Sequence, residues 1–312
     1  MTSSLQKTIL STSDVARLFS VTETTVKRWA DDGTLKCQKT PGGHRKFEIR
    51  NVVEFAEQNH FDPVGALEIP GDDAMGSKTQ VAVLGRDFPV LAAAYLRKAL
   101  ELEESGLYPF LSYLYQHCIQ LWEIHDLVIR PAMHEIGDRW SRGEVGIDRE
   151  HRASYETLEA LAMLQLQIRI KPSSGHAVIC ATLGDELHEI GLRCAHYLFE
   201  SEGWDSRYLG SRIPADAINA GIVIWKPAVV CLSSTCGASG DLNAELGRIV
   251  DAARSVGAVV LAGGALAGSL KREEGVIETA YNSAKSLLCY IQDFDRTGTD
   301  AGGAATGDAK RS

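Results

Sequence analysis

An alternation of apolar strand-like runs with amphipathic helical runs fills the carboxyl-terminal part of the sequence and most strongly limits its fold. Strand-like runs cover 176–183, 205–210, 228–234 and 258–263, with a short fifth run near 275–277. Helical runs lie near 191–202, 214–225, 241–256 and 279–292. Such alternation is typical of a parallel sheet with helices on both faces. We therefore expect residues 170–296 to form one α/β domain, followed by a disordered tail over 297–312.

The loop after the first of these strands carries the residues best suited to hold a ligand. It runs from Gly184 to Gly191 as Gly-Asp-Glu-Leu-His-Glu-Ile-Gly, and parallel sheets bind ligands at the carboxyl ends of their strands. His188 can ligate a metal through one ring nitrogen while the Glu186 carboxylate holds the other N–H. Gly191 leaves room for a bulky ligand against the backbone.

The pattern Glu186-x-His188-x-x-Gly191 resembles the cobalamin-binding signature Asp-x-His-x-x-Gly, in which the histidine is the lower axial ligand of cobalt. The resemblance continues downstream, since Ser233 ends one strand and Gly263-Gly264 ends another. In that family these positions accommodate the displaced nucleotide tail of cobalamin. Two positions depart from the signature: Glu186 replaces Asp, and Ser-Thr follows Ser233 where Ser-x-Leu is usual. The resemblance implies a flavodoxin-like cobalamin-binding domain; a loop histidine on an ordinary flavodoxin-like domain is the alternative.

Residues 1–59 have the pattern of a small DNA-binding head. Ser11-Thr-Ser-Asp14 is a capping box that opens a helix over 14–19, and Thr22 is the expected N-cap of a second helix over 23–30. Two helices joined by a tight turn form a helix-turn-helix. The residues expected to form their shared buried face are Val15, Leu18, Val26 and Trp29.

A turn and a basic segment follow this helix pair. Pro41-Gly-Gly is a typical turn sequence. The three side chains that follow it suit a hairpin wing that lies along a phosphate backbone. Residues 48–57 are expected to form a closing helix. This order resembles the winged helix-turn-helix of MerR-type regulators; a helical protein-interaction domain is the alternative. The residues expected to contact DNA are Thr24, Thr25, Lys27 and Arg28 on the second helix and His44, Arg45 and Lys46 on the wing.

Charge supports this division of the chain. The net charge is −9 overall, but residues 1–59 carry nine Lys/Arg against seven Asp/Glu, so a slightly basic head precedes an acidic body. No apolar run approaches ~20 residues and no apolar signal region begins the chain, so we expect a cytoplasmic protein without a membrane segment. The seven cysteines include no Cys-x-x-Cys pair and are expected to be reduced.

The middle of the chain is expected to be helical. Residues 60–79 contain turn-forming breakers and read as a linker. Within residues 80–169, apolar residues recur at helical spacing in four stretches, which are 88–104, 108–120, 122–142 with a kink at Pro131, and 147–168. This periodicity predicts a four-helix bundle.

One constellation in the predicted bundle carries a second resemblance. Trp140 ends the third stretch and Glu150-His151 follows after nine intervening residues, at the start of the fourth. This spacing resembles the Trp-x9-Glu-His signature of CarH-type light-dependent repressors. In that family these residues face the upper side of adenosylcobalamin and cover its adenosyl group. The aromatic ring can shield the adenosyl group from water, and the carboxylate can accept hydrogen bonds from ribose hydroxyls. A tryptophan that seals the end of a bundle beside a solvated Glu-His pair is the alternative.

A third departure concerns the residue after Trp140. In the best-known repressors of this type a histidine stands there and ligates cobalt after photolysis, whereas this chain has Ser141. The resemblance leaves the upper position after light to His134, His151 or water, or to no second protein ligand.

Together these resemblances imply a light-responsive repressor, not an enzyme, with adenosylcobalamin as its chromophore. It would bind operator DNA in the dark as a homo-oligomer, a tetramer by the resemblance, and separate into monomers in light. Three alternatives remain: a cobalamin sensor that ignores light, a corrinoid-carrying subunit for methyl transfer or radical rearrangement, and a regulator without cofactor.

Overall fold

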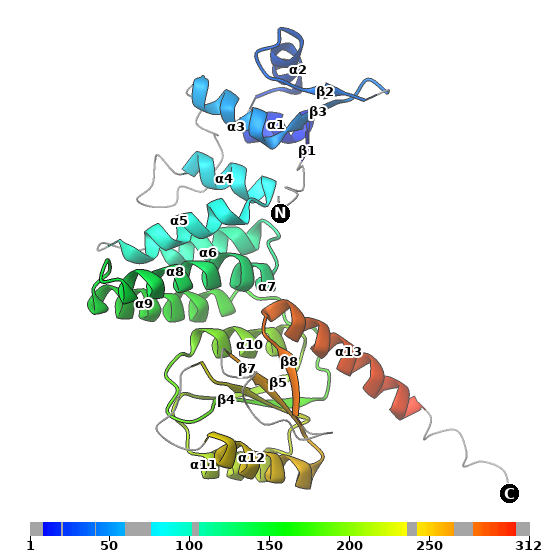
Figure 1. The fold of residues 1–312 in the computed structure, drawn as a ribbon. Helices are drawn as coiled ribbons and strands as arrows, with labels where there is room; N and C mark the ends of the chain where they lie inside the picture. Colours follow the sequence, from blue (N-terminus) through cyan, green and yellow to red (C-terminus); the bar gives the residue numbers. More distant parts are fainter. Residues whose placement is uncertain are drawn as a thin grey trace, which may run out of the picture.

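The computed structural model describes residues 9–19, 21–40, 42–59, 76–101, 106–235, 242–264 and 277–303. Figure 1 shows three parts stacked along the molecule: a small head, a layer of helices, and a sheet flanked by helices. The predicted linker lies mostly outside the described residues, since 60–75 are not among them.

The head contains three helices and a small antiparallel sheet. Its elements are β1 (Ile9–Ser11), α1 (Thr12–Leu18), α2 (Glu23–Asp31), β2 (Gln38–Lys39), β3 (Arg45–Glu48) and α3 (Ile49–Gln58), with β3 between β1 and β2. Its core contains Val15, Val26, Leu35, Phe47 and Val52, all completely buried. The Leu18 side chain, which the sequence assigns to this core, lies outside the described part of the structure.

The predicted caps form at both head helices. Ser11 and Asp14 exchange hydrogen bonds, from the Asp14 N–H to Ser11 Oγ at 3.2 Å and from the Ser11 N–H to Asp14 Oδ2 at 3.0 Å. Because Ser11 is therefore the N-cap, α1 begins at Thr12 and not at Asp14. Thr22 caps α2 by accepting from the Thr25 N–H at 3.3 Å.

The helical layer contains α4 (Gly76–Gly85), α5 (Phe88–Leu100), α6 (Leu107–Gln116), α7 (Leu121–Glu123), the π-helix η1 (Ile124–Ile129), α8 (Arg130–Ser141) and α9 (Ile147–Gln165). Helix α4 differs from the sequence prediction, which places 76–79 in the linker. Thr79 and Gln80 are buried there although they are polar, which explains why apolar periodicity missed the helix.

One continuous helical run, α7–η1–α8, spans residues 121–141. The sequence predicts a kink at Pro131, and the structure has a π-helical segment just before this residue, in which the Arg130 N–H bonds to the His125 carbonyl five residues back. Proline lacks the N–H that an α-helix would use at this point, and widening the preceding turn accommodates that loss.

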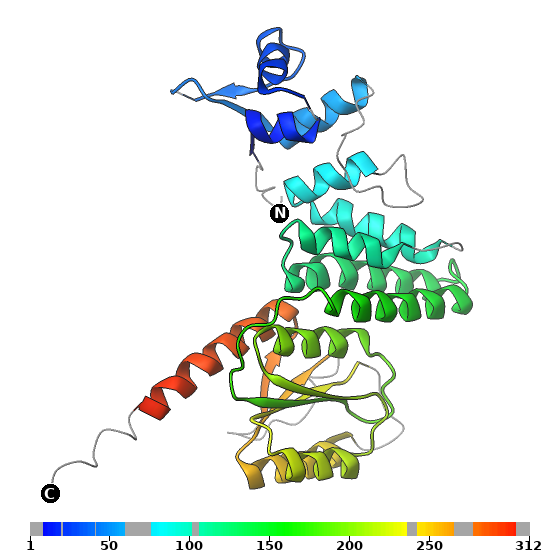
Figure 2. The same ribbon diagram turned by 180° about the vertical axis from the view of Figure 1, so that it is seen from behind.

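The sheet is parallel throughout and confirms the predicted α/β domain. Its strands are β4 (Ala177–Thr182), β5 (Asp205–Gly210), β6 (Val229–Ser233), β7 (Val259–Gly263) and β8 (Ile277–Tyr281), in the order β5-β4-β6-β7-β8. Figures 1 and 2 show α10 (Ile190–Ser201) and α13 (Ala284–Gly303) on one face, and α11 (Ala215–Trp225) and α12 (Leu242–Val256) on the other. Both faces are therefore covered, as the continuous apolar runs of the strands require.

The last strand and helix lie further along the chain than predicted. Strand β8 covers 277–281 where the sequence analysis starts a helix at 279, and α13 extends to Gly303. The predicted disordered tail is therefore wrong for 297–303, whose backbone is helical, and residues 304–312 lie outside the described residues. The run Ile277-Glu-Thr-Ala-Tyr281 ends in the turn-forming Asn282-Ser283, a stop signal that the prediction overlooked.

The helical layer and the sheet share one apolar core through α10. Leu161 and Leu164 of α9 belong to the same buried cluster as Leu192 and Leu198 of α10, and Leu287 of α13 also joins it. Helix α10 lies between the sheet and the helical layer (Figure 1). A displacement of the helical layer would therefore disturb buried apolar contacts with the sheet domain.

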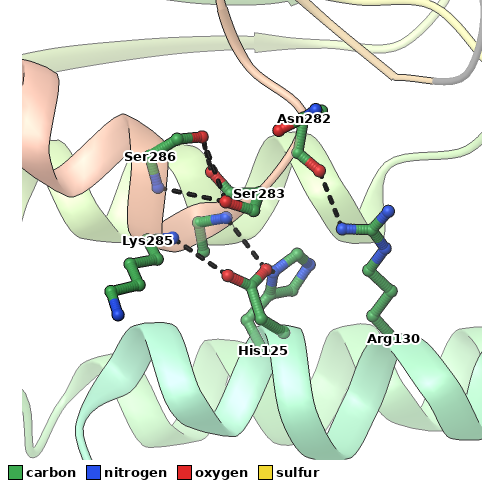
Figure 3. Close-up of polar contacts among 8 residues, drawn as sticks. His125, Arg130, Asn282, Ser283, Lys285 and Ser286 are labelled. Carbon is green, nitrogen blue, oxygen red and sulfur yellow. Dashed lines mark hydrogen bonds and ion pairs between the residues drawn. The ribbon is translucent and has the colours of Figure 1, made fainter. Parts of the chain in front are cut away.

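A polar junction reinforces this contact where η1 meets the start of α13 (Figure 3). Both Asp126 oxygens accept backbone N–H groups at 2.9 Å, one from Ala284 and one from Lys285. Nearby, the Arg130 guanidinium donates to the Asn282 carbonyl at 2.7 Å. A carboxylate at a helix amino terminus satisfies its exposed N–H groups and complements its dipole. The helical layer thus supplies part of the cap of the final helix.

The hydrogen bonds at this junction determine how Asp126 ionises. Burial raises the pKa of Asp126, but hydrogen bonds from His125, Ala284 and Lys285 outweigh burial and hold the pKa below its usual range. Because the folded-state pKa is lower than the unfolded one, the resulting stabilisation is present above about pH 4 and is lost as pH falls through the folded value.

We expect Asp126→Asn to lower the unfolding free energy by about 1–3 kcal/mol at neutral pH, because a buried charge-assisted pair of hydrogen bonds is lost. Urea unfolding of the two proteins tests this, with Asp138→Asn on the exposed surface of α8 as the matched control. The difference from wild type should shrink as pH falls below about 4. Equal unfolding midpoints at neutral pH would show that Asp126 does not stabilise the junction.

Candidate functional site: the His188 loop

The loop that carries His188 lies at the carboxyl edge of the sheet, between β4 and α10. Strand β4 has β5 on one side and β6 on the other, and the chain leaves β4 at the point where the strand order reverses. Open α/β sheets bind ligands at such a switch point, outside the carboxyl ends of the strands. The fold therefore places His188 where a ligand is expected.

A buried carboxylate orients His188. Glu186 Oε1 accepts the His188 backbone N–H at 2.8 Å and lies 2.6 Å from ring atom Nδ1. The other oxygen, Oε2, accepts the Thr235 N–H just after β6. The Glu186 side chain is 1% exposed, whereas that of His188 is 61% exposed. With Nδ1–H directed at the carboxylate, Nε2 is the ring nitrogen suited to bind a metal.

Thr182 ties the same loop to its neighbour. Its buried hydroxyl donates to the Glu186 carbonyl at 3.3 Å and accepts the Arg212 N–H at 3.0 Å. Thr182 thereby links the loop to the segment after β5, while Glu186 links it to the end of β6. The position of the loop therefore does not depend on Glu186 alone.

The predicted glycines have different local environments. A Cβ on Gly191 would meet nothing within 4 Å, so space is open there. Gly264 has φ +91, and a Cβ there would lie 2.2 Å from the Ser234 carbonyl oxygen, so the close approach of the two strand ends requires glycine. Gly263 pairs in register with Ser233 at the ends of β7 and β6.

Ser234 is the residue at this edge that the sequence analysis missed. Its hydroxyl is buried and has no hydrogen-bond partner among the described residues, although its backbone N–H donates to Gly263 at 2.9 Å. A buried hydroxyl without a partner is costly and marks a place where a ligand could bond. The sequence offered this residue as the second serine of Ser233-Ser234, but the comparison with the cobalamin-binding signature selected only Ser233 as a site residue.

The residues predicted to cover the upper side of the ligand lie where two helices of the layer meet. Trp140 is in the last turn of α8 and is 48% exposed, and Glu150 and His151 are in the first turns of α9. Glu150 accepts the Ser154 hydroxyl at 3.0 Å and its oxygen Oε2 lies 3.5 Å from His151 Nε2. Ser141 donates its hydroxyl to the Asp138 carbonyl at 2.7 Å. Helix α9 packs against α10, which follows the His188 loop.

In the head, α2 presents an exposed polar face. Thr24, Lys27 and Arg28 are exposed, and Lys27 pairs with Glu23 at 3.5 Å. Thr25 is half-buried, and its hydroxyl lies 3.0 Å from that of Thr22 within the helix cap. Thr25, one of the four residues on this helix predicted to contact DNA, therefore also takes part in the N-cap of the helix.

The strand β3 residues are less available than the sequence suggests. Arg45 binds both oxygens of Asp31 at 2.6 and 2.7 Å and its side chain is 18% exposed. Lys39 reaches the same carboxylate at 3.2 Å. Arg45 therefore ties the β2–β3 hairpin to the end of α2, while His44 remains exposed and Lys46 is half-buried.

The carboxyl-edge residues fit a cobalt corrinoid. His188 offers an imidazole held by a buried carboxylate, Ser234 offers an unpaired buried hydroxyl, and Gly264 permits the strand ends to approach closely. Nowhere in the described ranges do three His, Cys, Asp or Glu side chains group as a metal cage. In the same ranges, no helix has the length and apolarity to cross a membrane.

Three segments of the chain match family models. Residues 9–60 match a helix-turn-helix domain, residues 176–284 match a B12 binding domain, and residues 91–165 match a second B12 binding domain model. The HTH-type transcriptional repressor CarH of Myxococcus xanthus is 25% identical over 220 residues, which cover 67% of this chain and 73% of that protein. The chain thus has the architecture of a helix-turn-helix domain joined to B12-binding domains, as the sequence predicts.

One solved structure agrees with this chain on the fold. The monomethylamine corrinoid protein of Methanosarcina barkeri has a TM-score of 0.50 at 12% identity, over 65% of this chain and 96% of that one. A cobalamin-binding protein from Desulfitobacterium hafniense is 19% identical over 67% of this chain and 98% of that one, with a TM-score of 0.31, too low to bear on the fold.

We expect Glu186→Ala to change the ring tautomer of His188 even without a ligand. In the wild type the carboxylate should hold the proton on Nδ1, and its loss should move population toward the Nε2–H form. Nitrogen-15 NMR of the imidazole rings measures this directly, with Glu150→Ala as the control that should leave His188 unchanged. An Nε2–H tautomer in the wild type would contradict the assigned role of Glu186.

Proposed function

We propose that this protein, which joins a helix-turn-helix domain to B12-binding domains, is a transcriptional repressor that uses adenosylcobalamin to respond to light. The observation that carries the proposal is the exposed His188 held by the buried Glu186 at the switch point of the sheet. The similarity to the CarH repressor supports its regulatory part. The light response rests on the Trp140 and Glu150-His151 spacing alone.

In the proposed holoprotein, His188 would bind cobalt through Nε2, and Glu186 would fix the ring by holding Nδ1–H. Ser233, Ser234 and the Gly263-Gly264 pair would accommodate the nucleotide tail. When bound, adenosylcobalamin supplies a cobalt–carbon bond that visible light can break.

On the opposite side, Trp140 would exclude water from the adenosyl group, and Glu150 would accept hydrogen bonds from ribose hydroxyls. His151 lies beside Glu150 and would keep that carboxylate oriented. Trp140 is 48% exposed, and a bound ligand would cover this mostly apolar surface.

DNA binding would depend on assembly. In the dark, several heads on one oligomer, a tetramer in our proposal, would occupy one operator together and gain affinity by avidity. Light would move the helical layer and separate the oligomer into monomers, so each head would bind alone and weakly. This gives a switch of occupancy without any change in the heads themselves.

Ser141 favours a second candidate, a cobalamin-dependent regulator that ignores light. Its hydroxyl is engaged with the Asp138 carbonyl, and a hydroxyl replaces imidazole poorly as a cobalt ligand. A lit state would then use His134, His151 or water at the upper position, or no second protein ligand. The two candidates differ in whether light alters DNA occupancy.

We expect the holoprotein loaded with adenosylcobalamin in the dark to elute earlier in size exclusion than after green light. It should also shift a DNA duplex, selected from a random library by the dark protein, only before exposure. Apoprotein given the same light is the control and should not change its elution. Loss of the alkyl spectrum with unchanged size and occupancy would exclude the light switch and favour the second candidate.

We expect Arg28→Ala to weaken DNA binding several-fold and to reduce the slope of log affinity against log salt by about one, because one phosphate contact is lost. Fluorescence anisotropy over a salt series measures both quantities. Arg248→Ala, an exposed arginine on α12, is the matched control. Equal slopes for wild type and Arg28→Ala would remove Arg28 from the DNA interface.

Arg45→Ala tests the structural role of the hairpin tie. Losing the pairing with Asp31 frees the β2–β3 hairpin from α2, so we expect weaker DNA binding together with lower thermal stability of the head. Arg28→Ala should weaken DNA binding with unchanged thermal stability. A variant at Arg45 that weakens binding but leaves head stability intact would instead identify Arg45 as a direct phosphate contact.

A further inference from the structure

We infer that Glu189 is a positioning residue for His188, anchoring the His188 loop to the end of β5 as Glu186 anchors it to the end of β6. This inference rests on the proposed role of His188 as cobalt ligand. Glu189 directly follows His188 and is the N-cap residue of α10.

Glu189 accepts hydrogen bonds from three side chains, two of them on β5 or directly after it and one in the first turn of α10. Its Oε2 accepts the Tyr208 hydroxyl at 2.7 Å, and its Oε1 accepts the Ser211 hydroxyl. Arg193, one helical turn along α10, donates to Oε2 at 3.4 Å. A carboxylate that accepts several hydrogen bonds is held in a single orientation.

The partners of Glu189 are themselves fixed. The Arg193 guanidinium lies over the Tyr208 ring at 3.8 Å from its centroid, close enough for a cation–π interaction. Tyr208 belongs to β5, which pairs with β4 in the sheet. Glu189, Arg193 and Tyr208 therefore form a closed cluster that links the first turn of α10 to the neighbouring strand.

The strand order of the sheet shows why this cluster matters for His188. Strand β4 delivers the His188 loop, and its two neighbours in the sheet are β5 and β6. Glu186, two residues before His188, reaches Thr235 after β6, while Glu189, one residue after His188, reaches Tyr208 in β5. His188 thus lies between two carboxylates whose anchors stand on opposite sides of β4. Both ends of the short turn that carries the imidazole are fixed, which limits the ring to a narrow range of positions.

This arrangement predicts that Glu189 acts on cobalt only through His188. Losing a hydrogen-bond partner of a metal-ligating histidine typically weakens ligation about 10–100-fold. Glu189 acts one step further out, through the turn that carries His188, so its effect should lie at the lower end of that range. We therefore expect Glu189→Ala to lower the ratio of His188-ligated to unligated adenosylcobalamin by about tenfold. Tyr208→Phe removes one hydrogen bond and keeps the ring under Arg193, so its effect should be smaller and in the same direction.

The test is the absorption spectrum of dark protein loaded with adenosylcobalamin at one fixed pH, which distinguishes histidine-ligated from unligated cobalt, together with the cobalamin dissociation constant. Glu202→Gln, a carboxylate at the other end of α10 that pairs with Lys171, is the control and should match wild type. A double-mutant cycle with His188→Ala separates positioning from a general structural role.

Three outcomes divide the possibilities. If Glu189→Ala lowers ligation in the wild-type background and has no further effect on cobalamin affinity when His188 is absent, the inference holds. If it weakens cobalamin binding equally without His188, or leaves the ligated fraction unchanged, the inference is overturned. If wild type binds no cobalamin, or His188→Ala leaves its spectrum unchanged, the proposed function itself fails. Should Glu189→Ala not fold, Tyr208→Phe takes its place in the same cycle.

Discussion

The buried carboxylate of Glu186 is the interaction on which the site depends. Burying a charged carboxylate is costly unless hydrogen bonds compensate, and here two backbone N–H groups and a ring nitrogen surround it. That set joins β4, its loop and the end of β6 into one unit. As a result, the Nδ1 atom of His188 is held in place while most of the imidazole ring is exposed. A metal ligand needs this arrangement.

One continuous helical run connects the helical layer to the sheet domain. The α7–η1–α8 run is anchored near its start by Asp126 to the first turn of α13, and Trp140 lies near its other end, about 20 Å away along the helix axis. Because α10 and the layer also share an apolar core, the proposed movement of Trp140 would act on the sheet domain through packed elements, not through a flexible connection.

The sequence predicted most where local patterns decide structure. The strands β4 to β7 lie within one residue of their predicted ends because continuous apolar runs require burial on both faces. The prediction missed helix α4 because the buried polar residues Thr79 and Gln80 break its apolar periodicity. It placed β8 too early because residues 277–281 mix polar with apolar side chains. Roles that depend on tertiary partners could not be read from spacing: Arg45 is paired with Asp31, Ser234 lacks a partner among the described residues, and Glu189 meets Tyr208 and Ser211.

The most direct measurement is the electron paramagnetic resonance spectrum of the protein loaded with cob(II)alamin, prepared with and without nitrogen-15 histidine. One axial nitrogen-14 ligand splits each cobalt line into a triplet. If His188 is that ligand, histidine labelling should convert each triplet into a doublet, and His188→Ala should abolish the effect of the label. Triplets that persist after labelling would mean that the cofactor's own base binds cobalt, and the role assigned to the Glu186–His188 pair would be wrong.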